Sequence, residues 1–179
     1  MRCLIRSLLF PLAEPIFEKL VWPLRHAKNS YTLGNYVGCI ALCGMVGEMV
    51  AMLLWDISKV TLQGQSMTTI LQRVMFGRTF EKLGQDRRVA VLHGLKLVDD
   101  AAKAAFDSLR AIRSKYLHLF SQSHTQVAQD ARRAYENALQ VVAIVLGQTL
   151  ADGGVVLRPD LEAYLFDKGI IPRPESDTA

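Results

Sequence analysis

The chain has 179 residues, of which 50% are hydrophobic and 21% charged, and its formal net charge is +4. This length suits one domain with a sizeable core, and the scattered charges exclude an intrinsically disordered chain. The basic excess is concentrated in residues 78–115, which hold nine basic and five acidic residues, and is compatible with binding to RNA or another polyanion. Three cysteines argue against a disulfide framework and for a reducing compartment, so we expect a cytoplasmic protein.

The first predicted helix covers residues 13–28, and Pro23 must kink or end it. The apolar patch before it resembles a signal peptide, but prolines interrupt it early, so we expect a structured first segment. The second predicted helix, residues 35–59, contains a twenty-residue stretch with Glu48 as its single charge. That stretch is long enough to span a bilayer, but a carboxylate near its middle opposes insertion by roughly 2.5 kcal/mol or more. We therefore expect a buried central helix and no membrane partner.

Small residues line one side of this second helix. Gly44, Gly47 and Ala51 form a stripe that permits close approach of a neighbouring helix. Cys39 and Cys43 lie one turn apart on it, and without a second ligand pair they are expected to be core residues. If Glu48 is buried it needs a partner, and we consider Arg113 one candidate and solvent another.

Shorter elements are predicted next. Residues 61–66 are polar and predict a loop, and residues 67–77 predict a short helix. Residues 79–92 predict another helix with an interruption possible at Gly84, and Gly94 is expected to cap its C-terminal end. Strand signals are poor, because no sustained alternation of apolar and polar residues occurs.

The next predicted helix covers residues 98–120 and begins at Asp99 and Asp100, where negative charge suits a helix start. Apolar residues recur along it at spacings of three and four and build one face. These residues are Phe106, Leu109, Ile112, Tyr116 and Leu119.

Two further helices are predicted over residues 126–148 and 159–168, the second capped by Gly169, and residues 172–179 are expected to be a disordered tail. The fold class is therefore all-α, an up-and-down bundle of four or five helices in a single domain of residues 1–171.

The hexamer "RSKYLH", residues 113–118, lies near the C-terminal end of the predicted helix 98–120 and is rich in polar side chains. At about 100° per residue, Arg110, Arg113, Ser114 and His118 line one flank beside the core face and converge around Leu117. Tyr116 either orients a substrate or, as its spacing favours, lies in the core with an exposed hydroxyl, and Lys115 is expected in solvent. Arg110 either adds a phosphate contact or pairs with Asp107.

This flank has the chemistry for RNA cleavage without a metal. An imidazole can take the proton from a ribose 2′-hydroxyl or return one to a leaving oxygen. A guanidinium can hold the phosphate and stabilise its growing charge. The Arg-to-His spacing alone decides nothing, because about one match is expected by chance. A second match, Arg88 to His93, is interpreted as a decoy.

The context of the hexamer resembles a known family. "LRAIRSKYLH" follows "GLKLVDDAAKAAFDS" and precedes an Ala-rich helix, which resembles the signature of HEPN domains (higher eukaryotes and prokaryotes nucleotide-binding). Their mark is an Arg followed after four to six residues by a His, near the end of the third or fourth bundle helix. The segments "YVGCIALCGMVGEMVAMLLW", "FEKLGQ", "VLHGL" and "DARRAYENALQVV" fit the same helix order, so the resemblance covers residues 31–147.

The resemblance implies a helical bundle that dimerises, so that two motifs form one composite ribonuclease site. It implies Arg113 and His118 as the catalytic pair. From the residues of the flank we expect Arg110, Ser114 and Tyr116 to bind substrate, and we expect no metal or cofactor. Many members are toxins or antiphage effectors, so a nucleotidyltransferase-like antitoxin partner is also implied. The chain departs from the pattern at Ser114, where the family favours Asn. Two hypotheses follow: a metal-independent endoribonuclease, or a non-catalytic dimeric module that binds a nucleotide, RNA or protein.

Overall fold

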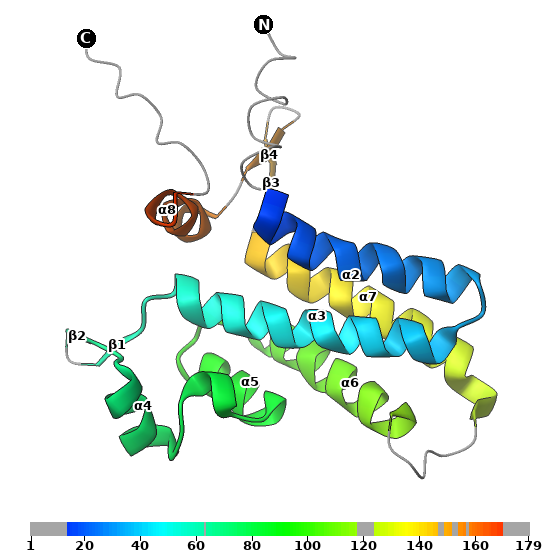
Figure 1. The fold of residues 1–179 in the computed structure, drawn as a ribbon, viewed down its shortest axis with the longest axis horizontal. Coiled ribbons are helices and arrows are strands. Elements are labelled where there is room, and N and C mark those ends of the chain that lie inside the picture. Colours follow the sequence, from blue (N-terminus) through cyan, green and yellow to red (C-terminus); the bar gives the residue numbers. More distant parts are fainter. Residues whose placement is uncertain are drawn as a thin grey trace, which may run out of the picture.

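The computed structural model describes residues 14–62, 64–117, 124–146, 149–151, 154–156 and 158–169. Helices dominate these residues, and the predicted all-α class is confirmed (Figure 1). The strands among them form two short antiparallel hairpins, which the sequence did not predict. The expected tail at 172–179 lies outside the described residues.

Helix α3, Tyr36–Ile57, is the central element. It packs against α2 (Glu14–Thr32), α6 (Asp100–Tyr116) and α7 (Val127–Leu146), which lie around it in Figure 1. Asn35 caps its start by accepting a hydrogen bond from the Gly38 amide at 3.0 Å. Buried side chains along α3 form the middle of the core, among them Ile40, Cys43, Val46, Val50 and Leu54.

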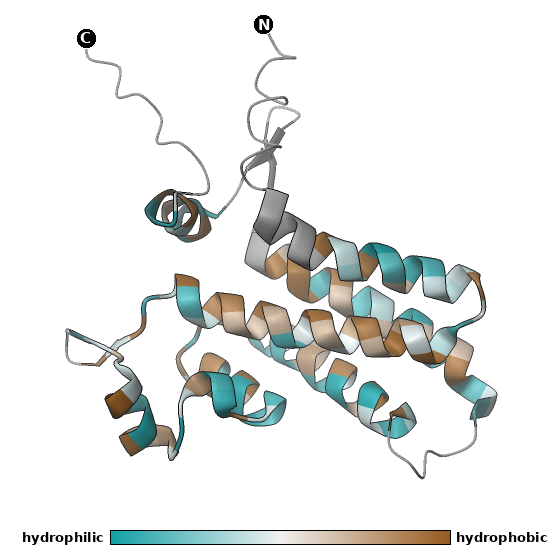
Figure 2. Ribbon diagram, in the orientation of Figure 1, coloured by the Kyte–Doolittle hydropathy of each residue, from teal (hydrophilic) through white to brown (hydrophobic). Residues whose placement is uncertain are grey.

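The length and apolar composition of α3 would also suit a membrane span, and half of that stretch is buried inside the structure. Hydrophobic residues recur along α3, as Figure 2 shows, because neighbouring helices cover it from several directions. A buried central helix accounts for this composition, as the position of Glu48 led us to expect.

Helix α2 runs through Pro23 and ends four residues later than predicted, at Thr32. Proline removes one helical hydrogen bond, but Pro23 is buried and α2 packs along both α3 and α7. Tertiary packing therefore outweighs the local cost, and Pro23 does not end the helix.

The segment after α3 forms small elements. The predicted loop contains a hairpin, β1 (Thr61–Leu62) paired with β2 (Gln65–Ser66). Helix α4, Thr69–Phe76, follows and ends at Gly77, whose φ of 77° is the left-handed conformation that glycine favours. The predicted interruption at Gly84 is confirmed, because it separates a 3₁₀ turn, η1 (Phe80–Lys82), from α5 (Gln85–Gly94).

The expected cap at Gly94 is wrong. Gly94 is the last helical residue of α5, and the left-handed conformation falls on Lys96, with φ 57°. The Leu97 amide donates to the Leu92 carbonyl and the Lys96 amide to the His93 carbonyl, each at 2.9 Å, which is the Schellman pattern that closes a helix.

A 3₁₀ turn, η2 (His124–Gln126), precedes α7, and the hairpin of β3 (Thr149–Ala151) and β4 (Gly154–Val156) follows it. Helix α8, Pro159–Asp167, ends the described chain as predicted, with Gly169 at φ 67°.

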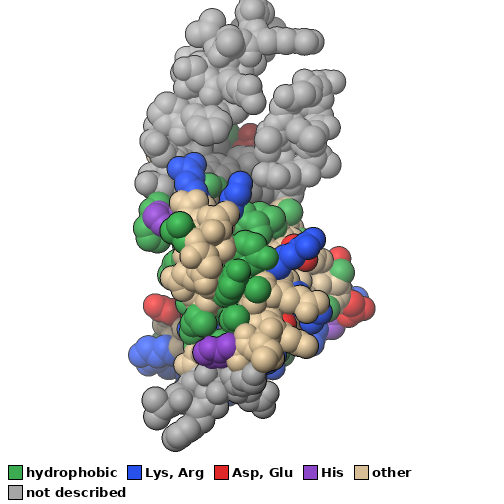
Figure 3. All heavy atoms as spheres, turned by 90° about the vertical axis from the view of Figure 1, so that its right-hand side faces the viewer, with side chains coloured by type: hydrophobic (Ala, Val, Ile, Leu, Met, Phe, Trp, Pro, Cys, Tyr) green, Lys and Arg blue, Asp and Glu red, His purple; other side chains and the backbone are tan. Residues whose placement is uncertain are grey.

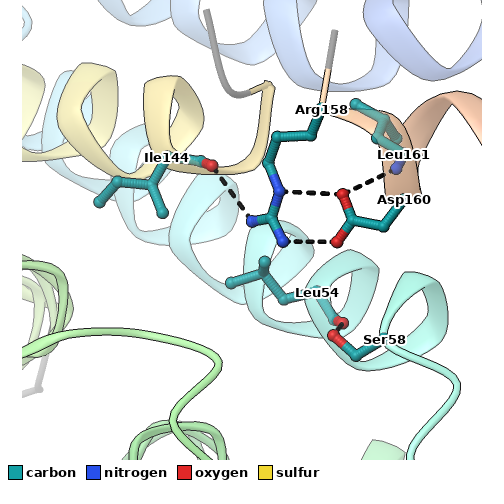
Figure 4. Close-up of polar contacts among 6 residues, drawn as sticks. All are labelled: Leu54, Ser58, Ile144, Arg158, Asp160 and Leu161. Atoms are coloured by element: carbon teal, nitrogen blue, oxygen red, sulfur yellow. Dashed lines mark hydrogen bonds and ion pairs between the residues drawn. The ribbon is translucent and has the colours of Figure 1, made fainter.

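Polar contacts attach α8 to the long helices. Arg158 donates two hydrogen bonds to the Asp160 carboxylate, at 3.0 and 2.5 Å (Figure 4). Its third guanidinium nitrogen donates to the Ile144 carbonyl of α7 at 3.4 Å. Lys59, just after α3, pairs with Asp167 at 2.5 Å. Leu161 and Leu165 are fully buried, so α8 belongs to the same core.

Candidate functional site on helix α6

The predicted start and apolar face of α6 are confirmed. Asp99 is the N-cap and accepts a hydrogen bond from the Ala102 amide at 2.7 Å. The end differs from the prediction, because α6 ends at Tyr116 and Leu117 is its non-helical cap. The residues predicted for its apolar face that lie within α6 are all buried: Phe106, Leu109, Ile112 and Tyr116.

Arg113 reaches across to α3. Its Nη1 donates a hydrogen bond to Glu48 Oε1, so the two side chains form an ion pair. Both remain partly in water, with 44% and 39% of their side-chain surfaces exposed. Glu48 therefore has both of the environments considered for it, pairing with Arg113 and contact with solvent. The pair satisfies the charge of Glu48 within the apolar stretch of α3.

The small residues of α3 make room for this pair. A Cβ added at Gly44 would lie 2.5 Å from Cδ of Arg113, and one at Gly47 would lie 3.2 Å from a methyl carbon of Leu109. The Gly47 carbonyl also accepts a hydrogen bond from Gln85 Nε2 of α5 at 3.1 Å. The predicted close approach of a neighbouring helix is confirmed, and that neighbour is α6.

The space beside Arg113 is small. A cavity of about 20 Å³ lies there, lined in part by Glu48, Gln85, Phe106 and Arg110. It holds roughly one water molecule and cannot enclose a nucleotide. A large ligand at this site must therefore bind on the exposed flank of α6.

That flank contains Arg110, Ser114 and Leu117, which are all exposed. The expected alternative of an Arg110–Asp107 pair is wrong, because Asp107 pairs with Lys103 at 2.6 Å. His118, the predicted proton-transfer group, lies outside the described residues. The structure therefore brings Arg110, Arg113 and Ser114 to one flank of α6 and does not describe the Arg113–His118 distance.

A polar cluster that the sequence did not predict lies on the other side of α6. Asp130 of α7 is 8% exposed, and its Oδ2 accepts hydrogen bonds from Lys115 Nζ and the Tyr116 hydroxyl, each at 2.7 Å. The expectation that Lys115 is merely solvated is therefore wrong. Tyr116 is in the core as expected, but at 4% exposure its hydroxyl is turned to Asp130 instead of solvent.

The same contacts shift three pKa values. The hydrogen bond from Lys115, followed by that from Tyr116, lowers the pKa of Asp130. Burial, followed by the bond to Asp130, raises the pKa of Tyr116. The pKa of Lys115 is raised mainly by its hydrogen bond to Asp130. All three groups are held in their usual charge states near neutral pH, so the cluster serves to join α6 to α7. A substrate could make the predicted contact with the Tyr116 hydroxyl only by displacing Asp130.

The decoy pair has structural partners. His93 Nε2 lies 2.8 Å from Asp100 Oδ1, which links the end of α5 to the start of α6. Arg88 donates to the Phe80 carbonyl at 3.3 Å and to the Glu81 carbonyl at 2.5 Å. Both side chains hold neighbouring elements in place, so His93 is a suitable control for His118.

Cys39 and Cys43 are fully buried free thiols, as expected of core residues. A hydrogen bond with Cys39, followed by burial, raises the pKa of Cys43 and keeps it neutral. Within the part of the chain that the structure describes, no group of three or more His, Cys, Asp or Glu could hold a metal ion.

Two residues of these clusters carry very different signals in the sequence. Glu48 stands out as the single charge within residues 36–55, and a buried carboxylate needs a partner. Asp130 gives no such signal, because an acidic residue in the first turn of a helix is ordinary.

No protein-family model, curated protein or solved structure matches this chain.

Proposed function

We propose that this chain is a HEPN-like, metal-independent endoribonuclease that acts in the cytoplasm as a homodimer. Its helices would follow the up-and-down order of that family, and the flank of α6 would contact RNA. Arg113 carries the proposal: it is half exposed, it is held by a defined partner, and it shares the flank with Arg110 and Ser114. A fixed guanidinium beside a second arginine suits an RNA phosphate.

The ion pair leaves Arg113 able to bind phosphate. A guanidinium has five N–H donors, and Nη1 supplies the one that meets Glu48. The remaining donors can meet a phosphate while Glu48 fixes the side chain. In the reaction, the imidazole of His118 would take the 2′-hydroxyl proton and the 2′-oxygen would attack the neighbouring phosphorus. The bond from phosphorus to the 5′-oxygen would break, and the protonated imidazole would return a proton to that leaving oxygen. Arg113 would stabilise the charge that grows on the phosphate.

A homodimer would complete the site. Leu117 is 41% exposed among the polar groups of the flank, an arrangement that suits a contact with a second copy. In such a dimer the two Arg/His pairs would face one cleft and bind one RNA strand. A nucleotidyltransferase-like antitoxin is the partner that this reading implies. Light scattering at micromolar concentration tests the assembly, and a monomer would contradict it.

A second function, a non-catalytic dimeric module that binds a nucleotide, RNA or protein, is favoured by one observation. Glu48 already neutralises Arg113, and a carboxylate beside the arginine weakens its attraction for phosphate. Ser114, where the family favours Asn, points the same way, because a hydroxyl is shorter and offers one donor instead of two. In this reading the ion pair serves to join α3 and α6.

The two functions separate in one experiment. Purified protein is incubated with a mixed RNA pool, with and without EDTA, beside His118→Ala, Arg113→Lys and the control His93→Ala. The ribonuclease reading expects EDTA-resistant cleavage that leaves 2′,3′-cyclic phosphate ends and is lost in His118→Ala but kept in His93→Ala. Cleavage that survives His118→Ala unchanged points to another source. A folded dimer that cleaves nothing supports the non-catalytic module.

A further inference from the structure

Helix α4 turns its apolar face to solvent. Ile70 is 73% exposed and Val74 78%, and Met75 beside them is 49% exposed. Together with Leu62 of the preceding hairpin, 39% exposed, these residues form what we call the α4 face. Figure 1 places α4 at the margin of the molecule, and Figure 2 shows hydrophobic residues on it there.

The inward face of α4 is occupied by a polar anchor. Gln72 is buried, donates to the Met67 carbonyl at 3.0 Å, and accepts from the Phe80 amide at 2.9 Å. At about 100° per residue, Ile70 and Val74 lie about 160° from Gln72 on either side. Ile70 and Val74 therefore point away from the core, whereas Gln72 and Phe76 face inward.

Aromatic packing fixes this orientation. Phe76, one turn after Gln72, packs edge-on against Trp55 of α3, with ring centroids 6.1 Å apart. Trp55 also stacks on Phe80 with centroids 4.2 Å apart and planes 7° apart. Rotating α4 to bury Ile70 and Val74 would break both the Gln72 hydrogen bonds and the ring contact. The exposed face is thus built into the fold.

The charges within the segment that carries the α4 face are of one sign. Residues 57–80 contain no Asp or Glu, and their charged residues are Lys59, Arg73 and Arg78. Lys59 is paired with Asp167, whereas Arg73 and Arg78 are exposed near the apolar residues. An apolar face with basic residues beside it matches a surface that is apolar and negatively charged.

Geometry selects a lipid surface over a protein. Four side chains on a protruding helix and hairpin cannot supply the about 800 Å² per partner that specific protein interfaces bury. Pairing with a second copy would also bring the arginines of both copies together. A bilayer needs only shallow insertion of a few apolar groups, with basic groups at the phosphate level. We infer that the α4 face binds peripherally to anionic membranes.

This inference does not depend on the proposed function. We expected no membrane partner from the sequence because that expectation considered only whether the apolar stretch of α3 spans a bilayer. Peripheral binding needs no such stretch, because the α4 face arises from how α4 is rotated against the core.

The test is sedimentation of the full chain with vesicles of phosphatidylcholine alone or with 30 mol% phosphatidylserine. The variants are Ile70→Gln/Val74→Gln, Arg73→Gln/Arg78→Gln and the control Leu33→Gln. Leu33 is 84% exposed in the α2–α3 turn, at the end of the molecule that Figure 3 views, where hydrophobic side chains also gather. It therefore reports whether any exposed leucine would give the same effect.

We expect binding to the anionic vesicles that weakens with salt. Replacing both apolar residues should weaken it about tenfold or more. Replacing the arginines should weaken it about fivefold for each charge. Leu33→Gln should bind like the wild type, and unchanged melting temperatures show that the variants fold.

Three results would overturn the inference: no binding by the wild type, equal binding by Ile70→Gln/Val74→Gln, or an equal loss in Leu33→Gln. A lipid-free dimer that Ile70→Gln/Val74→Gln turns into a monomer would also overturn it, and would assign the α4 face to a second copy.

Discussion

Glu48 and Arg113 are separated by 65 positions in the chain and form an ion pair between α3 and α6. The pair exists because Gly44, one turn before Glu48, leaves the space that the stem of Arg113 fills. A carboxylate, a guanidinium and a glycine thus form one unit. Its strength, its dependence on space and its effect on RNA can each be measured.

The first prediction concerns the strength of the pair. Glu48→Gln and Arg113→Gln, alone and together, form a double-mutant cycle in urea unfolding. Because both side chains are partly in water, we expect a coupling free energy of about 0.2–1 kcal/mol that falls as salt rises. Additive effects of the two changes would mean that the pair contributes nothing to stability.

The second prediction concerns space at Gly44. Gly44→Val should lower the free energy of unfolding by about 1–3 kcal/mol, because the branched side chain overlaps Arg113 and overpacks the junction. Gly94→Ala is the matched control. A Cβ there meets nothing within 4 Å, so stability should stay the same or rise by up to about 1 kcal/mol. Equal stability of Gly44→Val and wild type would contradict the close approach of α6.

The third prediction concerns RNA. If Arg113 contacts phosphate, Glu48→Gln should tighten binding to RNA about two- to fivefold at low salt, because a competing negative charge is removed. The same change made in an Arg113→Gln background should have a smaller effect. Fluorescence anisotropy with a labelled single-stranded RNA measures both. A change of equal size in the two backgrounds would show that Glu48 acts on the overall field and not through Arg113.

The fourth prediction concerns pH and the Asp130 cluster. The folded pKa of Asp130 is lowered below its ordinary value, so its stabilising contribution is present above the unfolded carboxyl value of about 4. That contribution should be lost as the pH falls through the folded pKa. The difference in unfolding free energy between wild type and Asp130→Ala should therefore become smaller as the pH falls below about 4.

Tyr116→Phe is the companion variant for this cluster. It removes the hydroxyl that donates to Asp130 and should cost about 1 kcal/mol at pH 7. Chemical denaturation across pH 2–7 checks both variants. A stability difference for Asp130→Ala that does not change with pH would argue that Asp130 stabilises the fold only by packing.

The sequence by itself determined the helical class and several helix ends. The spacing of Phe106, Leu109 and Ile112 marks the buried face of α6, and Asp99 and Gly169 mark helix ends, because periodicity and capping are local properties of the chain. It also indicated that Glu48, if its helix is buried, needs either solvent or a basic partner. It could not choose that partner, since several basic residues were compatible with one carboxylate.

Only the tertiary structure decided which residues meet. The pairing of Glu48 with Arg113, and of Tyr116 with Asp130, depends on how α3, α6 and α7 are rotated and shifted against one another. Pro23 stays inside α2, and Ile70 and Val74 stay in solvent, because packing elsewhere outweighs local preference. Local preferences amount to fractions of a kcal/mol per residue, whereas burial of a large side chain contributes about 1.5–3 kcal/mol. The rotation of each helix therefore follows from the whole core.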